Sequence, residues 1–226
     1  MTASPLANLT PRQQLQAPRL AHRVTQLMVG LTLYGVSMAL VIRSLLGQLP
    51  WDVFHVGVAT HIPLTIGEVI VVASFVVLIL WIPLRQMPGL GTILNAIWIG
   101  LATDATLAVL ASPDSLALRA VMLVGGILLN GVATASYIGS QLGPGPRDGL
   151  MTGLARRTGL SIRLVRTGLE VTVVALGWLL GGTFGLGTVL YAVSIGPLTQ
   201  ALLPWFTVPL DDEHITETHA ATPTDA

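Results

Sequence analysis

The stretch that decides the fold occurs twice, as GQLPWDVFHVGVATHIPLT at residues 47–65 and as GPGPRDGLMTGLARRTGLS at residues 143–161. Each copy opens with glycine and proline, places an aspartate early, and ends on a threonine or serine that can cap a following helix. An early proline and a first-turn aspartate are typical of a helix N-terminus. Because each stretch is too long for a tight turn and too polar for a full membrane span, we predict one short helix in each copy.

Around these stretches the two halves of the chain repeat each other with an offset of 96 residues. Residues 20–107 align without a gap on residues 116–203, and roughly 34 of some 88 aligned pairs are identical. The identical pairs include a proline, an aspartate and a Gly-Leu-Gly-Thr run, which apolar composition alone would not keep in step. The sequence therefore predicts two copies of one three-helix unit, at 20–107 and at 116–203.

The composition indicates a membrane protein. Hydrophobic residues make up 52% of the 226 residues and charged residues only 10%, and the mean hydropathy is +0.75. A typical soluble domain has roughly 25% charged residues, so both a soluble enzyme and a disordered chain are excluded. Six apolar stretches are long enough to cross a bilayer, and they lie at about 24–46, 64–84, 91–111, 118–139, 162–181 and 187–206.

Three spans per copy is an odd number, so the second copy must enter the membrane from the opposite side. With the N-terminus inside, nine of the eleven arginines fall on the cytoplasmic side, as the positive-inside rule requires. We therefore predict an all-α polytopic membrane protein with six transmembrane helices in two inverted-topology three-helix repeats, each with a short or re-entrant helix after its first span. A disordered lead-in (1–19) and an acidic tail (207–226) are both predicted to be cytoplasmic, in a bacterial plasma membrane.

The reactive side chains exclude several kinds of site. The chain has no cysteine, and all of its basic residues are arginine, so thiolate metal sites and Schiff-base lysines are ruled out. Its five histidines lack metal-ligand spacing, and no segment interleaves basic with aromatic residues as a nucleic-acid site does. We predict no enzymatic activity, metal, cofactor or nucleic acid. The expected partners are the lipid bilayer and a small-molecule solute, with an oligomer or a partner subunit left open.

Three candidate residues for solute binding or proton coupling lie in the repeated stretches. Asp52 and Asp148 share one repeat position, at the expected N-termini of the two short helices. If these helices are re-entrant, both carboxylates face a central cavity; if they lie flat at the interface, the carboxylates only cap them. Arg147 is either an anion contact or half of an ion pair with Asp148.

Two further candidates, Asp104 and Glu170, lie inside predicted spans, where a charge costs several kcal/mol unless it is paired or hydrated. Arg166 precedes Glu170 by four residues and is expected to neutralise it on the same helix face. Asp104 has no partner on its own helix, although Arg43 in the first span could reach it.

Other residues favour packing or solvation over chemistry. Gly35 and Gly131, each followed by an alanine four residues later, predict a close approach of the first and fourth spans. Asn130 is expected to hydrogen-bond between helices. Trp51 is interpreted as an interfacial anchor, and His55 as a solvated loop residue.

Four runs resemble the YczE/YitT-type bacterial integral membrane proteins: PRDGLMTGLARRTGLSIRLVRTGLE (146–170), GGTFGLGTVLYAVSIGPLTQ (181–200), LPWDVFHVGVA (49–59) and LWIPLRQMPGLGT (80–92). The likeness covers roughly residues 20–206. It implies a bacterial plasma-membrane protein, and it hints at export, because some relatives are grouped with small-molecule exporters and one is tied to peptide-antibiotic production. It supplies no binding residues.

These observations predict a small secondary transporter that exports a small organic solute or antibiotic-like compound by alternating access. Two alternatives stay open. One is a passive channel that uses the inverted short helices as a filter. The other is a non-transporting membrane subunit or assembly factor of a larger complex.

Overall fold

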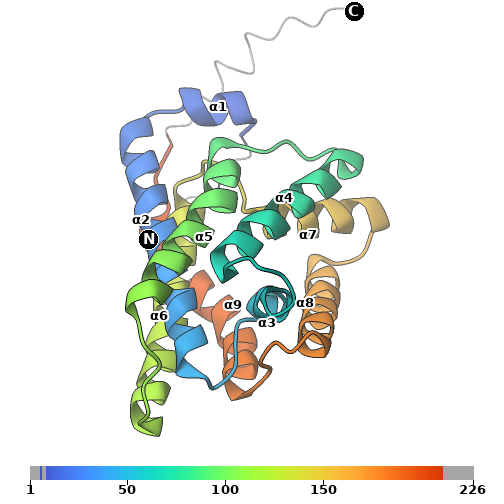
Figure 1. Ribbon diagram of the computed structural model, residues 1–226. Coiled ribbons are helices and arrows are strands. Elements are labelled where there is room, and N and C mark those ends of the chain that lie inside the picture. Colours follow the sequence, from blue (N-terminus) through green and yellow to red (C-terminus); the bar gives the residue numbers. More distant parts are fainter. Residues whose placement is uncertain (1–5, 7–8, 211–226) are drawn as a thin grey trace, which may run out of the picture.

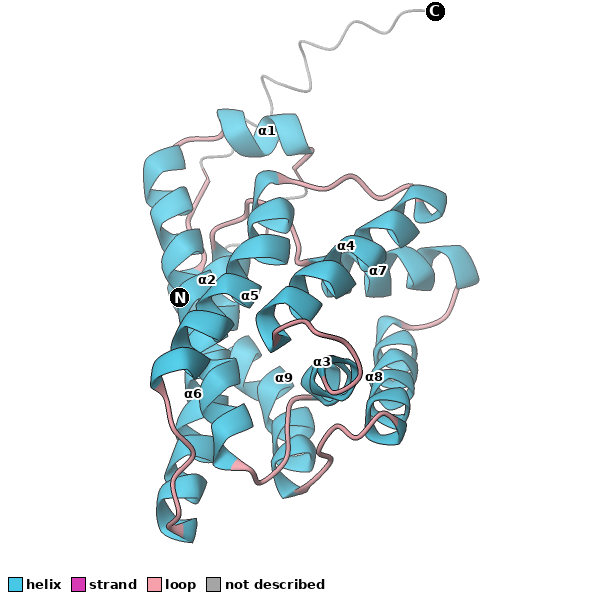
Figure 2. Cartoon of the chain, viewed as in Figure 1, coloured by secondary structure: helices cyan, strands magenta, loops and turns pink. Residues whose placement is uncertain are grey.

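The structure is a computed structural model in which residues 6 and 9–210 are described (Figure 1). That part of the chain folds into nine α-helices and contains no strand (Figure 2). The helices are α1 (Pro11–Gln16), α2 (Leu20–Ser44), α3 (Pro50–Ala59), α4 (Ile66–Leu84), α5 (Leu90–Val109), α6 (Leu116–Gly139), α7 (Pro146–Thr158), α8 (Ile162–Leu179) and α9 (Leu186–Phe206).

The helices follow the sequence repeat. Helices α2, α3, α4 and α5 begin at residues 20, 50, 66 and 90, and α6, α7, α8 and α9 each begin 96 residues later, at 116, 146, 162 and 186. The unusual backbone positions between helices also match. Leu45 and Gln141 have φ of 58° and 55°, and Gly47 and Gly143 have φ of 119° and 116°. The two halves therefore share their local backbone as well as their sequence.

The four long helices α2, α5, α6 and α9 pack together, with α2 against α6, α5 against α2 and α9 against α6. The short helices cross between the halves: α3 packs against α8, and α7 packs against α4 (Figure 1). Each short helix therefore rests on the helix that directly follows the short helix of the other half.

Two backbone hydrogen bonds fasten the halves to each other reciprocally. The amide of Gly91 at the start of α5 donates to the carbonyl of Leu142 at 2.7 Å, and the amide of Gly187 at the start of α9 donates to the carbonyl of Leu46 at 2.8 Å. The loop before α3 lies so close to α9 that a side chain at Gly47 would meet the backbone of Gly185, and its positive φ also favours glycine. The glycines at the start of the repeated stretches therefore allow each loop to lie against the start of a helix in the other half.

Helices α2 and α6 approach closely, but not through the predicted pair of glycines. A side chain at Gly30 would lie 2.9 Å from the backbone nitrogen of Tyr137 and would clash there, and Gly126 is packed against α2 in the equivalent way. Gly35 and Gly131 face α5 and α9 instead. Small residues at the right spacing fix a close approach, but the spacing alone does not say which neighbouring helix provides it.

A polar contact joins three of the long helices, as predicted for Asn130. Its amide nitrogen donates to the Ser37 hydroxyl at 2.8 Å, and its amide oxygen accepts from the Tyr191 hydroxyl at 2.9 Å. Asn130 is fully buried, so both bonds replace contacts with water that the interior cannot offer.

Five helices are long and apolar enough to cross a membrane: α2, α4, α5, α6 and α9. The sixth predicted span, at 162–181, corresponds to α8, which is not among them. The physical reason is that its 18 residues include three charged ones, Arg163, Arg166 and Glu170. The structure thus supports an all-helical membrane protein with five candidate spans.

The N-terminal segment differs from the prediction of a disordered lead-in at 1–19, because residues 11–16 form α1. The buried Arg23 of α2 donates to the carbonyls of Gln14, Ser140 and Gln141 at 2.7, 2.9 and 2.6 Å. This arginine therefore ties α1 to the C-terminal end of α6. Residues 1–5 and 7–8 of the predicted lead-in, and 211–226 of the predicted acidic tail, lie outside the described residues.

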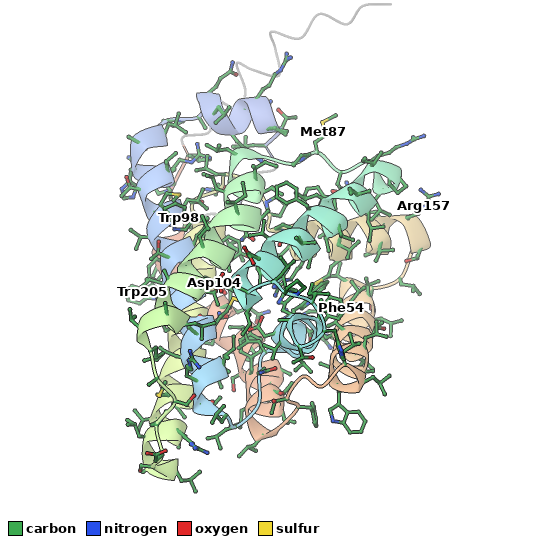
Figure 3. The ribbon with its side chains drawn as sticks, viewed as in Figure 1. Phe54, Met87, Trp98, Asp104, Arg157 and Trp205 are labelled. Carbon is green, nitrogen blue, oxygen red and sulfur yellow. The ribbon has the colours of Figure 1, made fainter. Side chains whose placement is uncertain are left out.

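Asp104 joins the start of α4 to α5 (Figure 3). Its carboxylate accepts hydrogen bonds from the Thr65 hydroxyl and, at 2.8 Å, from the Gly67 amide. Arg43, which could have reached Asp104 from the first span, donates to the carbonyl of Leu107 at 2.7 Å instead. The contacts of Asp104 are therefore those of a residue that positions one helix on another.

We expect Asp104→Ala to lower the free energy of unfolding by about 2 kcal/mol, because the Gly67 amide loses its acceptor. The measurement is thermal unfolding in detergent. The matched control is Gln200→Ala at the equivalent position of α9, which is exposed and should leave the melting temperature unchanged. Equal melting temperatures for the two variants would contradict the assigned role.

Candidate functional site

A cavity of about 210 Å³ lies where the two short helices begin. Pro50 and Trp51 from the start of α3 line it together with Arg147 and Asp148 from the start of α7. The remaining walls come from α2, α6, α8 and α9 and include Tyr34, Tyr137, Tyr191, Arg166, Glu170 and Thr199. Both repeated stretches therefore bring their N-terminal ends to one central space.

A smaller cavity of about 50 Å³ stands in the equivalent position of the other half. Ile70 and Ser74 of α4 line it where Arg166 and Glu170 of α8 line the larger cavity, and each pair is separated by 96 residues. The fold thus builds two related cavities. Arg147 and Asp148 line both of them, and the one beside α8 is the larger and also carries Arg166 and Glu170.

Arg147 and Trp51 occupy the same repeat position and meet in the centre of the molecule. The guanidinium carbon of Arg147 lies 4.9 Å from the centroid of the Trp51 ring, within the range of a cation–π contact. Trp51 is only 8% exposed, so the interpretation of it as an interfacial anchor is wrong. Its buried indole nitrogen has no hydrogen-bond partner.

Among the described residues Arg147 forms no ion pair, so the expected pair with Asp148 is not present.

Asp148 lies at the junction of several cavities. One carboxylate oxygen accepts a hydrogen bond from the Tyr137 hydroxyl at 2.6 Å. The residue lines the central cavity, its smaller counterpart and a third cavity of about 390 Å³ that α1 borders with Gln14. Among the described acidic residues, Asp148 therefore has the widest access to the interior spaces.

The first turns of α3 and α7 are not capped by side chains. The N-cap residues are Leu49 and Gly145, and neither gives a side-chain hydrogen bond to the helix. The partial positive charge of each helix N-terminus can therefore interact with the carboxylate in its own first turn and with a group in the cavity.

Asp52 is buried beside the cavity but does not line it. It is 0% exposed, its Oδ1 lies 3.2 Å from Nδ1 of His55, and its Oδ2 has no partner. His55 is 1% exposed, so the interpretation of it as a solvated residue is wrong. Burial lowers the pKa of His55, and the hydrogen bond that the ring donates to the Asp52 carboxylate opposes that effect.

The Arg166–Glu170 pair is present as predicted, with 2.9 Å between Nε and Oε1. Of the five candidate residues, Arg147, Asp148 and Glu170 line the central cavity, Asp52 is adjacent to its wall, and Asp104 lies elsewhere, between α4 and α5. Within residues 9–210 no three acidic or histidine side chains gather as a metal site would require.

Sequence reasoning missed the tyrosines. All three tyrosines of the chain, Tyr34, Tyr137 and Tyr191, line the central cavity. A usable signal was present, since each lies within an apolar stretch, where a phenol hydroxyl needs a polar partner. The bonds from Tyr137 to Asp148 and from Tyr191 to Asn130 supply those partners.

We expect the melting temperature of the protein to decrease as the pH is lowered from 7.5 to 5.5, partly because of His55. The unfolded histidine binds a proton near pH 6.5, whereas the buried ring has a lowered pKa, so the unfolded state takes up more protons as the pH falls. His55→Gln should flatten this dependence, and His22→Gln, at an exposed position, should not. Identical slopes for both variants would count against a buried neutral His55.

The chain is similar to several bacterial proteins. It is 44% identical over 180 residues to an uncharacterized protein of Haemophilus influenzae, a match that covers 80% of this chain and 83% of that protein. It is 32% identical over 172 residues to the uncharacterized membrane protein YczE of Bacillus subtilis, covering 76% and 80% of the two chains. The uncharacterized protein YyaS of the same organism is 29% identical over 183 residues, covering 78% and 90%.

The predicted resemblance to YczE is thereby confirmed. No solved structure matches the chain. The apolar helices and the relationship to YczE together indicate a multi-pass membrane protein. The model of a family of unknown function, DUF6198, matches residues 21–204, and the chain belongs to this family.

Proposed function

We propose that the protein is a secondary transporter of the bacterial plasma membrane that moves a small organic solute by alternating access. The observation that carries the proposal is the central cavity into which both short helices point their N-termini. Transporters built from repeated halves place their substrate sites between the halves and bound them with the ends of interrupted helices.

In this proposal the two halves are inverted repeats, and α8 is the sixth span. Two of the charges that set α8 apart, Arg166 and Glu170, pair with each other and line the cavity. A charge pair that faces an interior space is the usual arrangement for ionisable residues within a membrane. Both termini then lie in the cytoplasm, as the arginine distribution predicts.

The donors around the cavity favour a solute with an anionic group. Arg147 has no carboxylate partner, the Trp51 indole nitrogen beside it is unpartnered, and neither α3 nor α7 has a side-chain cap. An anion at this place would meet a guanidinium and two positive helix ends. The tyrosine rings supply apolar surface for the rest of the solute.

Asp148 is the best placed group for proton coupling. It borders the central cavity and also the cavity beneath α1, which lies toward the proposed cytoplasmic end. Protonation of this carboxylate would remove a negative charge next to the proposed anion site. Solute binding and protonation would then favour each other, which is the linkage that coupled transport requires. Export is the direction that the family resemblance favours.

The chain is free of cysteine, so a single introduced thiol tests alternating access without knowledge of the solute. We expect Thr199→Cys, on the cavity wall, to react with a membrane-impermeant thiosulfonate added from either side of the membrane. Ser37→Cys, fully buried, is the control that should react from neither side. We also expect a change of pH to shift the labelling of Thr199→Cys from one side of the membrane to the other. Asp148→Asn, which keeps an acceptor for Tyr137, should abolish this shift, and Asp114→Asn in an exposed loop should not.

Labelling of Thr199→Cys from one side only would contradict alternating access and favour a non-transporting subunit. Steady ionic currents in a planar bilayer would favour a channel. If the response to pH survives in Asp148→Asn, the assignment of proton coupling to Asp148 is wrong.

A further inference from the structure

The two halves differ most where α8 and α9 separate. The equivalent helices α4 and α5 pack directly against each other, whereas α8 and α9 leave a groove of about 710 Å³ between them. Its walls are mostly apolar and include Val171, Val174, Ala175, Trp178, Val189 and Val193. Trp178 and Val193 are 65% and 70% exposed, so the groove opens on the outer surface of the helix bundle, where lipid would lie.

The separation has a cause in the sequence. Gly67 of α4 lies against the carbonyl of Gly100 of α5 so closely that neither position has room for a side chain. The equivalent residues of the second half are Arg163 and Gly196. An arginine in place of Gly67 prevents the same approach, and around Gly196 nothing lies within 4 Å of where a Cβ would stand.

The hydrogen bonds that hold α4 on α5 are also missing from the second half. Asp104 accepts from Thr65 and Gly67, but its counterpart is Gln200, which is exposed. The opening therefore results from substitutions at the contact itself, in a repeat that elsewhere keeps its packing.

The groove adjoins the central cavity, because Pro50 and Glu170 line both spaces. These two residues form the wall between the groove and the cavity. The polar side chains of the groove are few, namely Thr167, Thr188 and Glu170. The groove is apolar toward the lipid, and the adjoining cavity carries Arg147 and Asp148.

We propose that the groove between α8 and α9 is a lateral entrance that accepts the apolar chain of an anionic amphiphile arriving from the bilayer. The inference rests on the proposed function, because it names the chemical class of the solute. An apolar wall gives little net affinity to a chain that leaves equally apolar lipid, so the charged group supplies the specificity. The charged cavity directly behind the groove favours a single chain with a charged end over a second copy of the protein, since a helix is about 10 Å across and could cover only the mouth of the groove.

The test is photolabelling of the full-length protein in liposomes with a 16-carbon fatty acid that carries a diazirine at the end of its chain. We expect labelled peptides from α8 and α9, and at least tenfold less labelling there with the corresponding fatty alcohol. Ala175→Phe, which fills the groove, should lower this labelling at least tenfold. The matched control is Ile79→Phe at the equivalent position of α4, which is exposed and outside the groove. Ala192→Phe on α9 serves as a second filling variant if Ala175→Phe does not fold.

Equal labelling in the filling variants and in Ile79→Phe, or equal labelling by acid and alcohol, would overturn the proposal. So would a disulfide-linked dimer formed by Val193→Cys in the membrane, since a second copy would then cover the groove. The two proposals fail separately. If Thr199→Cys reacts from both sides while the filling variants label normally, the lateral entrance is wrong and alternating access stands. If the labelling is as expected while Thr199→Cys reacts from one side, the entrance is right and transport is wrong.

Discussion

The structure depends on the reciprocal hydrogen bonds between the loops before the short helices and the starts of α5 and α9. A loop that is packed in the interior of a protein has backbone carbonyls that need partners other than water. Here the carbonyl of Leu142 is met by the amide of Gly91, and that of Leu46 by the amide of Gly187. Because each bond crosses from one half to the other, neither half can complete its interrupted region alone. The N-termini of α3 and α7 are thereby fixed at one central cavity.

The side chains that distinguish the cavity and the groove lie at positions where the two halves differ in sequence. Arg147 replaces the equivalent Trp51, and the two side chains stack on each other. Glu170 stands where the first half has Ser74, and with Arg166 it adds a charge pair to the larger of two related cavities. Arg163 replaces Gly67 and separates α8 from α9. Duplication supplies the scaffold, and substitutions at a few contact positions give the second half its polar cavity and its open groove.

Much of the fold could be predicted from local signals. The offset of 96 residues recurs in the starts of four pairs of helices, and the proline and glycine positions of 47–65 and 143–161 mark where short helices begin. The contacts that could not be predicted join side chains far apart in the sequence, because the sequence alone does not show which of them meet in space. Arg43 could have reached Asp104, but Asp104 instead meets the start of α4, and His55 is buried by the packing of α3 rather than solvated. The sequence marks the three tyrosines as polar groups in apolar stretches, but it does not show that they line one cavity.

Impermeant maleimide labelling of equivalent exposed positions shows whether the two halves are inserted in opposite directions, as we propose. Leu64→Cys and Leu160→Cys lie 96 residues apart, in the loops that lead into α4 and α8, and are 37% and 49% exposed as leucines. If the halves are inverted, position 64 is labelled from outside in intact cells, and position 160 is labelled only after the membrane is permeabilised. Labelling of both positions from the same side would contradict opposite insertion.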